Sequence, residues 1–249
     1  MDAVLELRHV RAGYGDLPVL EDVNLVVPRH RVVGLVGESG SGKSTAARVA
    51  AGLLTPTSGQ VLLEGKPLVG RRSKADCRRI QMVFQNPEGS LNPKYRVGRA
   101  IEEAMVFHGV ATRLEAREKT ARLLARMELP ADAADRLPRS FSGGQKQRVA
   151  LARALAVEPE LLIADEATSA LDVSVQLRML ELIRALRAER NLTILFISHD
   201  LGVIRHVCDE VVVMRAGRVL EAQSADDFFR RPATEYGREL LDSVPRIDF

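Results

Sequence analysis

The sequence predicts an α/β fold with a parallel core, an N-terminal antiparallel β subdomain and an inserted helical subdomain. The N-terminal third is rich in β-branched residues, the middle is charged, and after Ser140 short apolar stretches alternate with helical ones. Such alternation is typical of a parallel sheet covered on both faces. We expect one domain, with its core at about 1–90 and 141–222, the helical subdomain at about 91–140 and a tail at about 223–249.

The N-terminal strands are expected where apolar residues lie between turn residues. These strands cover residues 4–10, 19–27, 31–36 and 60–63. A helix over residues 43–54 follows the third strand, because its apolar residues recur with helical spacing.

The spacing of apolar residues also predicts the helices of the middle segment and the alternating strands and helices after Ser140. Helices are predicted over 98–107, 112–128, 145–157 and 173–189. Buried strands are predicted over 160–164 and 192–197, and a hairpin over 211–214 and 218–221.

Composition excludes several classes of protein. The chain is 46% hydrophobic, but it has no run of about 20 apolar residues that could span a membrane, and its N-terminus does not look like a signal peptide. We therefore expect it to stay in the cytosol and to reach a membrane through partners. The net charge of +3 is spread along the chain and aromatic residues are 4%, which argues against nucleic-acid binding. Cys77 and Cys208 lie far apart and predict reduced thiols rather than a metal cluster.

A glycine-rich segment follows the third predicted strand and opens the helix behind it. It matches G-x-x-x-x-G-K-[ST], in which backbone N–H groups and a helix N-terminus face a phosphate. Lys43 would reach the β- and γ-phosphates, and the Ser44 hydroxyl would be a Mg²⁺ ligand. A flexible Gly/Ser loop is the alternative, but both flanking elements fit a phosphate loop. The candidate nucleotide-binding residues here are Gly37, Glu38, Ser39, Gly40, Ser41, Gly42, Lys43, Ser44 and Thr45.

Two acids, Asp165 and Glu166, end an apolar strand. Parallel sheets bind ligands at the carboxyl ends of their strands. Asp165 would hold Mg²⁺ and Glu166 would accept a proton from the attacking water. By itself the pair could be a solvated strand end, so the interpretation depends on the phosphate loop upstream.

A second glycine pair lies in Ser142, Gly143, Gly144 and Gln145, at the start of the predicted helix 145–157. A serine there can be an N-cap, but capping does not call for two glycines. Exposed N–H groups at a helix N-terminus suit a phosphate. Since one nucleotide does not need two phosphate loops, this segment would serve ATP bound on another copy or partner.

In this order and spacing, the three segments resemble the ATP-binding-cassette family over nearly the whole chain. The resemblance implies a P-loop NTPase cassette with a RecA-like core, which hydrolyses ATP with Mg²⁺. Tyr14 matches the aromatic that stacks on adenine, and His199 matches the histidine that contacts the γ-phosphate. Gln85 matches the glutamine that senses Mg²⁺ and links to transmembrane subunits, and residues 169–172, ending in Asp172, match the loop that crosses the dimer interface. The implied catalytic residues are Glu166, His199, Gln85 and Lys43, and the implied metal ligands are Ser44, Gln85 and Asp165.

Three segments are similar to the peptide/nickel branch of importer ATPases. They are residues 85–93, residues 169–176 and the tail 232–241. In the tail, Thr234-Glu235 replaces the branch's usual His-Pro and Gly237 replaces its threonine. The branch implies a solute that is a peptide, nickel or a related compound.

The resemblance also implies partners. ATP would lie between the phosphate loop of one cassette and Ser142–Gln145 of a second cassette subunit, with a heterodimer expected over a homodimer. Two transmembrane permease subunits and, indirectly, an extracytoplasmic solute-binding protein complete the system, which places the chain in the cytoplasm at the inner face of the cell membrane. The alternative is a non-transport cassette, a scaffold subunit of a cytosolic enzyme complex such as those of phosphonate breakdown. A regulatory subunit without turnover is disfavoured by Glu166 and His199.

Overall fold

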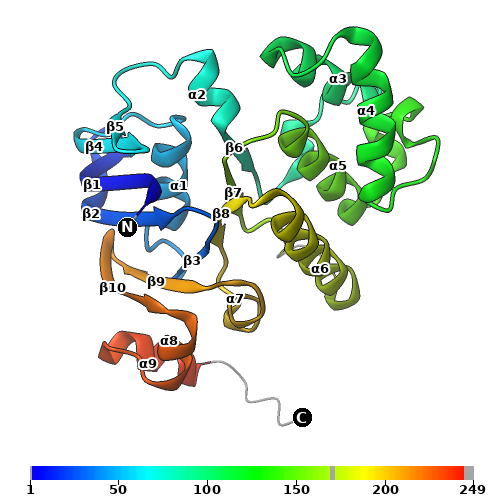
Figure 1. Cartoon of the computed structure of the whole chain (residues 1–249). Coiled ribbons are helices and arrows are strands. Elements are labelled where there is room, and N and C mark those ends of the chain that lie inside the picture. Colours follow the sequence, from blue (N-terminus) through cyan, green and yellow to red (C-terminus); the bar gives the residue numbers. More distant parts are fainter. Residues whose placement is uncertain (1, 169–171, 244–249) are drawn as a thin grey trace. The chain divides into compact units, whose positions relative to one another are not determined.

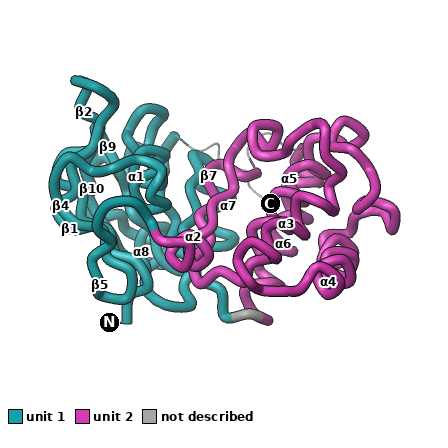
Figure 2. Tube along the Cα trace, turned by 90° about the horizontal axis from the view of Figure 1, so that it is seen from above, with its two compact units in different colours: residues 1–72, 191–249 teal, residues 73–190 magenta. Residues whose placement is uncertain are grey.

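The computed structural model describes residues 2–168 and 172–243, and it divides the chain into two compact units. Unit 1 comprises residues 1–72 and 191–249, and unit 2 comprises residues 73–190. The elements are labelled in Figure 1, and Figure 2 colours the two units separately. Each unit is described in turn below.

An antiparallel sheet occupies the first part of unit 1. Its strands lie in the order β2-β1-β4-β5, and β1 pairs with both β2 and β4. Buried and exposed residues alternate along β1 and β2, as expected of a sheet with one face on the core. The bounds are β1 Ala3–Tyr14, β2 Leu17–Pro28, β4 Ser58–Leu63 and β5 Lys66–Pro67.

The second sheet of unit 1 is built around β3 (Val32–Val36), all five residues of which are buried. It pairs in parallel with β8 (Thr193–Ile197) and with β9 (Glu210–Arg215). Antiparallel to β9 runs β10 (Arg218–Ser224), as the sequence predicted for this hairpin.

The helix after β3, α1 (Lys43–Ala51), ends three residues earlier than expected. Gly52 adopts the left-handed conformation at φ 77°, and its N–H donates to the carbonyls of Arg48 and Val49. Glycine is the residue that adopts this conformation without strain, so it terminates the helix. Three further helices of unit 1 were not predicted: α7 (Leu201–Val207), α8 (Ala225–Arg230) and α9 (Glu235–Asp242).

Unit 2 combines helices with a pair of parallel strands, β6 (Ile80–Val83) and β7 (Leu161–Asp165). The predicted helices of the middle are present, and a capping box at Thr112 sets the start of α4. The sequence did not predict the six-residue α2 or the four-residue β6, because elements this short show little periodicity. The helices are α2 Lys74–Arg79, α3 Val97–His108, α4 Arg113–Arg126, α5 Gly143–Ala156 and α6 Val173–Arg190, with 3₁₀ turns at Pro87–Ser90, Ala133–Asp135 and Pro138–Ser140.

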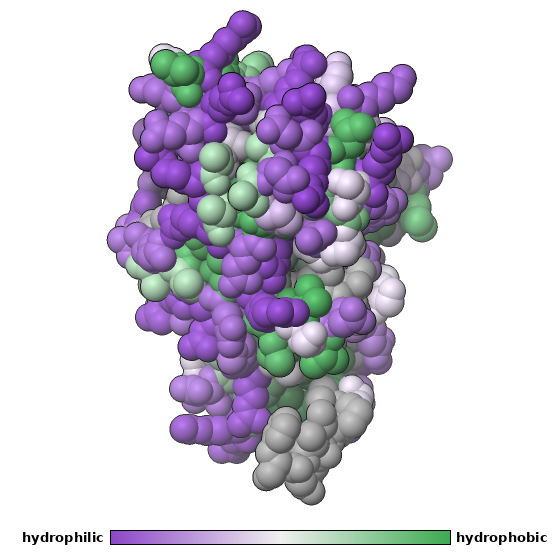
Figure 3. Space-filling model, turned by 90° about the vertical axis from the view of Figure 1, so that its right-hand side faces the viewer, coloured by the Kyte–Doolittle hydropathy of each residue, from purple (hydrophilic) through white to green (hydrophobic). Residues whose placement is uncertain are grey.

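The face drawn in Figure 3 is mostly hydrophilic, with small separate groups of hydrophobic residues. Among the described residues, no helix combines the length and the apolar character needed to cross a membrane.

The parallel sheet of unit 1 should depend on Phe196, which lies on β8 and is fully buried. We expect Phe196→Ala to lower the free energy of unfolding by about 3–5 kcal/mol, because it leaves a cavity that the packed neighbours cannot fill. Phe107→Ala is the matched control, since Phe107 is 62% exposed, and it should cost about 1 kcal/mol or less. Urea unfolding followed by circular dichroism measures both, and equal losses would contradict this account of the core.

Candidate functional site

The predicted phosphate loop connects β3 to α1 and is shaped by glycines. Gly37, Gly40 and Gly42 all have positive φ, at 148°, 81° and 104°. A Cβ at Gly37 would lie 2.1 Å from the carbonyl oxygen of Met214, which belongs to β9. No side chain fits at this point, so the loop can leave β3 in this direction only with glycine at position 37.

The turn of the β9–β10 hairpin holds the loop from one side. The Gly217 N–H donates to the Ser41 carbonyl at 2.9 Å, and the Glu21 N–H of β2 donates to the Gly217 carbonyl at 2.8 Å. A Cβ at Gly42 would lie 2.9 Å from Cδ2 of Leu20. The loop is therefore braced by two neighbouring elements of unit 1 and does not depend on α1 alone.

The side chain of Lys43 turns back into the loop, and the residue is buried. Its ammonium donates to the carbonyls of Gly37 and Glu38, each at 2.7 Å, and to the Ser41 hydroxyl at 3.3 Å. Next to it, Ser44 is partly buried and Thr45 is buried, both in the first turn of α1. The geometry gathers a cation, hydroxyl groups and a helix N-terminus at one place, which suits a phosphate anion.

Tyr14 lies at the end of β1 and is held by a residue that sequence reasoning missed. Nη1 of Arg48 donates to the Tyr14 hydroxyl at 2.7 Å, and its guanidinium lies 6.0 Å from the ring centroid. The Tyr14 side chain is nonetheless 43% exposed, so its ring can still accept a stacking partner. Arg48 lies on α1, five residues after Lys43, so the same helix contributes to the phosphate loop and to this contact.

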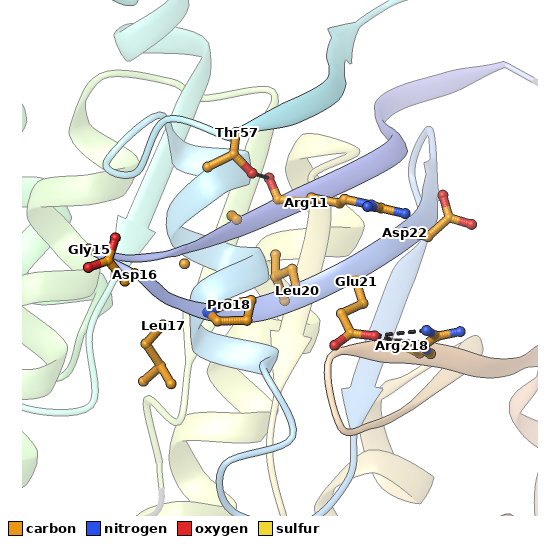
Figure 4. A pocket seen from close by; sticks show the side chains of 12 residues that line it. Arg11, Gly15, Asp16, Leu17, Pro18, Leu20, Glu21, Asp22, Thr57 and Arg218 are labelled. Carbon is orange, nitrogen blue, oxygen red and sulfur yellow. Dashed lines mark hydrogen bonds and ion pairs between the residues drawn. The ribbon is translucent and has the colours of Figure 1, made fainter.

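A hollow of about 640 Å³ adjoins the β1–β2 turn, and Gly15 and Asp16 of this turn line it (Figure 4). Charged residues of both signs line it, including Asp16, Asp22 and Arg11. The Arg218 guanidinium and the Glu21 carboxylate form an ion pair on its wall at 2.8 Å.

His199 lies two residues beyond the end of β8 and is exposed. Because β3 and β8 are parallel, with Leu35 opposite Ile197, the phosphate loop and His199 emerge at the same edge of this sheet. Asp200 caps α7 by accepting from the Gly202 and Val203 N–H groups, which fixes the backbone next to the histidine. The parallel register thus places the loop that holds Lys43 and the residue His199 at one edge of the sheet. Both are predicted to contact the γ-phosphate.

Unit 2 repeats this arrangement with β6 and β7. Val83 lies opposite Ala164, so Gln85, two residues beyond β6, and Glu166, directly after β7, emerge at the same edge of the pair. Nε2 of Gln85 donates to Oε2 of Glu166 at 2.8 Å, while Asp165 is buried at the end of β7. Glu166 has φ 47°, a left-handed conformation that strains a non-glycine residue and that is often found at functional sites.

Ser142 is the N-cap of α5, with a capping box. Its hydroxyl accepts from the Gln145 N–H at 3.3 Å, and the Gln145 side-chain oxygen accepts from the Ser142 N–H at 3.0 Å. The helix start, including Gly143 and Gly144, is open to solvent or only partly buried. The interpretation of Ser142 as an N-cap is therefore correct, and a role toward a second nucleotide stays a prediction.

Known proteins resemble the chain in both sequence and structure. The ABC transporter family profile matches residues 20–169, and oligopeptide transport ATP-binding protein AppF of Bacillus subtilis is 42% identical over 98% of this chain and 79% of its own length. The chain belongs to the ABC transporter family. It is an ATPase of that family, and the P-loop cassette fold that the sequence predicted is confirmed.

Two solved cassettes of the ABC family share this fold. The first is cbiO1 from Clostridium perfringens, part of the ABC transporter complex cbiONQ, with a TM-score of 0.81 and 30% identity, covering 99% of this chain and 98% of that one. The second is the dimeric post-hydrolysis state of the ATP-binding cassette MJ0796 bound to ADP and Pi, with a TM-score of 0.80 and 29% identity, covering 89% and 98%.

The loop assigned to the ABC dimer interface is described only at its end. Residues 169–171 lie outside the described residues, and Asp172 is exposed immediately before α6. Its carbonyl accepts from the Val175 and Gln176 N–H groups, so its backbone opens the helix.

The residues assigned to Mg²⁺ fit that ion by their chemistry. Ser44 offers a hydroxyl, Asp165 a carboxylate and Gln85 an amide oxygen, and Mg²⁺ prefers hard oxygen ligands of this kind. In the described part of the chain, no group of three or more His, Cys, Asp or Glu residues is arranged to hold a metal ion.

Sequence reasoning also missed the contacts that join α5 to the segment after β6. Nε2 of Gln147 donates to the Phe84 carbonyl at 3.1 Å, directly before Gln85. Lys146 pairs with Glu88 and lowers the pKa of its carboxyl, and Arg153 donates to the Ser90 carbonyl. Burial lowers the pKa of Arg153. These polar positions on a helix facing a loop give no periodic signal, so only the structure reveals them.

The Gly37 contact gives a direct test of the loop geometry. Gly37→Ala should lower the free energy of unfolding by about 2–5 kcal/mol, because it adds backbone strain to a clash with the Met214 carbonyl. Gly40→Ala is the control, since Gly40 also has positive φ but a Cβ there would meet nothing within 4 Å. It should cost only the strain of about 1–2 kcal/mol. Urea unfolding compares the two, and a smaller loss for Gly37→Ala than for Gly40→Ala would contradict the geometry.

Proposed function

We propose that this ATPase energises an importer of peptides, binding MgATP at the phosphate loop and hydrolysing it with Glu166 as general base. The observation that carries the catalytic part is the 2.8 Å hydrogen bond between Gln85 and Glu166, with Asp165 beside them. It orients a carboxylate at the end of a buried strand, where parallel sheets bind their ligands. A carboxylate held in this way can orient a water and take its proton.

Each residue of the site then has a defined task. The loop from Gly37 to Thr45 binds the phosphates with backbone N–H groups, and Lys43 places a positive charge against the β- and γ-phosphates. Tyr14 stacks on the adenine and His199 donates to the γ-phosphate. Ser44, Asp165 and Gln85 would each offer an oxygen to Mg²⁺, which would neutralise charge on the phosphates.

Hydrolysis depends on a second cassette subunit. The N–H groups at the start of α5, in Ser142–Gln145, serve the nucleotide of the partner, and Asp172 lies in the loop that crosses between the two. ATP thereby joins two cassettes, and its hydrolysis removes the contact. We propose a heterodimer as the working form.

The assembly around the dimer follows from the import function. Two transmembrane permease subunits convert closure into transport, Gln85 links the nucleotide to them, and a solute-binding protein outside the cytoplasm delivers the cargo. The chain works at the inner face of the membrane. Its single cassette domain has a core at about 1–90 and 141–222, a helical subdomain at about 91–140 and a tail at about 223–249.

Peptides are the proposed cargo rather than nickel. The support is the 42% identity to AppF, a protein named for oligopeptide transport, over 98% of this chain.

The role of Glu166 is tested by Glu166→Gln. The amide keeps the shape and the Gln85 contact but cannot take a proton, so turnover should fall by about 10²-fold or more while MgATP binding is kept. Phosphate release and equilibrium binding measure the two properties. Glu118→Gln, an exposed change on α4, is the control and should leave both unchanged. Near-normal turnover in Glu166→Gln would exclude it as the general base.

The transport role is tested with the same variant. Glu166→Gln protein with MgATP should trap the closed dimer, so affinity capture from native membranes should recover two polytopic permeases and a second cassette. Recovery of soluble enzymes alone would contradict the importer function while leaving the ATP site intact.

A further inference from the structure

The C-terminal segment 232–242, noted in the sequence but given no task in hydrolysis, is docked within unit 1. Glu221 of β10 is buried, and its carboxylate accepts from the Ala233 N–H at 2.6 Å and from the Thr234 N–H and hydroxyl, each at 3.0 Å. Thr234 in turn caps α9 by accepting from the Gly237 N–H at 3.0 Å. One buried carboxylate therefore fixes the start of α9.

The glycine at position 237 allows this close approach. A Cβ there would lie 1.9 Å from Oε1 of Glu221. A larger side chain at this position would not fit against the hydrogen-bonded Glu221 carboxylate in this arrangement.

The docked helix presents Tyr236 to the phosphate loop. Tyr236 is buried, and the Arg215 guanidinium lies 4.4 Å from its ring centroid. The hydroxyl of Tyr236 accepts a hydrogen bond from the Glu38 N–H at 3.1 Å. Residues 198 positions apart are therefore in direct contact at the predicted nucleotide site.

The contact fixes one peptide group from both sides. The carbonyl of Gly37 and the N–H of Glu38 belong to the same peptide, and in a trans peptide they point in opposite directions. Lys43 donates to that carbonyl at 2.7 Å, and Tyr236 accepts from that N–H at 3.1 Å. A rotation of this peptide would break both bonds, so Tyr236 helps to hold the loop in the conformation that also places the Lys43 ammonium.

We propose that Tyr236 is a positioning residue for the phosphate loop, and that docking of segment 232–242 sets the affinity of the loop for nucleotide. The inference rests on the proposed function, because it takes the loop as the phosphate site. Tyr236 acts through the Gly37–Glu38 peptide and does not touch the nucleotide. Preorganising a loop strengthens binding because less conformational freedom is lost when the ligand arrives.

Removal of one hydroxyl tests the proposal. Tyr236→Phe keeps the ring under Arg215 and deletes the acceptor of the Glu38 N–H. MgADP binding, measured by isothermal titration calorimetry, should weaken about threefold to tenfold, the range for the net loss of one hydrogen bond. MgADP is the probe because it occupies the loop without turnover. Tyr95→Phe deletes a hydroxyl in unit 2 and is the matched control, which should bind as wild type does.

A purely structural role would give a different result. One hydrogen bond contributes about 0.5–1.5 kcal/mol net, so the Tm of nucleotide-free Tyr236→Phe should fall by no more than a few degrees. A lowered Tm with unchanged MgADP affinity would overturn the proposal. Failure of the wild-type chain to bind MgADP would instead overturn the proposed function, so the two failures are distinguishable.

A second variant tests whether the tail acts as a unit. Gly237→Ala places a methyl group against Glu221 and should displace α9, which weakens MgADP binding as Tyr236→Phe does. If both act through the same contact, the double variant should bind no more weakly than the weaker single variant, because coupled sites are not additive. If the losses of MgADP affinity in the two single variants add fully in the double variant, the two residues do not act through the same contact. Should Gly237→Ala fail to fold, the Tyr236→Phe comparison alone decides.

Discussion

The predicted nucleotide site depends on the close approach of the loop after β3 to the β9–β10 hairpin. Gly37 directly follows the fully buried strand β3. A Cβ on this residue would lie only 2.1 Å from the carbonyl oxygen of Met214. That approach lets the Gly217 N–H reach the Ser41 carbonyl and lets Lys43 fold back onto the Gly37 and Glu38 carbonyls. A loop braced in this way meets a phosphate with its N–H groups and its cation already in place, which is how electrostatic stabilisation becomes effective.

The register of the parallel strands positions Glu166 and His199. Parallel pairing of β6 with β7 sets Gln85 beside Glu166, and parallel pairing of β3 with β8 brings His199 to the edge where the phosphate loop begins. Glu166 directly follows β7 and His199 lies two residues beyond β8, and every residue of both strands is buried. Packing of apolar residues therefore fixes where the polar residues stand, and a one-residue slip would point each of them to the other face.

The sequence predicted the parts of this site that are local and left out those that join distant segments. The phosphate loop, the acids at the end of β7 and the helix start at Ser142 could be predicted, because each is a short pattern beside a periodic strand or helix. The contacts Arg48–Tyr14, Gln147–Phe84 and Glu38–Tyr236 join residues 34, 63 and 198 positions apart, and no spacing in one sequence encodes such pairs. Helix α9 was missed for a related reason: eight residues form a stable helix only when docked, here on Glu221.

The central claim is that the loop built around Gly37 binds the nucleotide through its phosphates, and equilibrium binding of MgATP to wild type and Lys43→Ala tests it most directly. Lys43 carries the charge that the loop places against the phosphates, and truncation removes a charge-assisted contact from a buried position. The account predicts saturable binding to wild type and a loss of about tenfold to a hundredfold in affinity for Lys43→Ala. Equal affinity of the two proteins would contradict it.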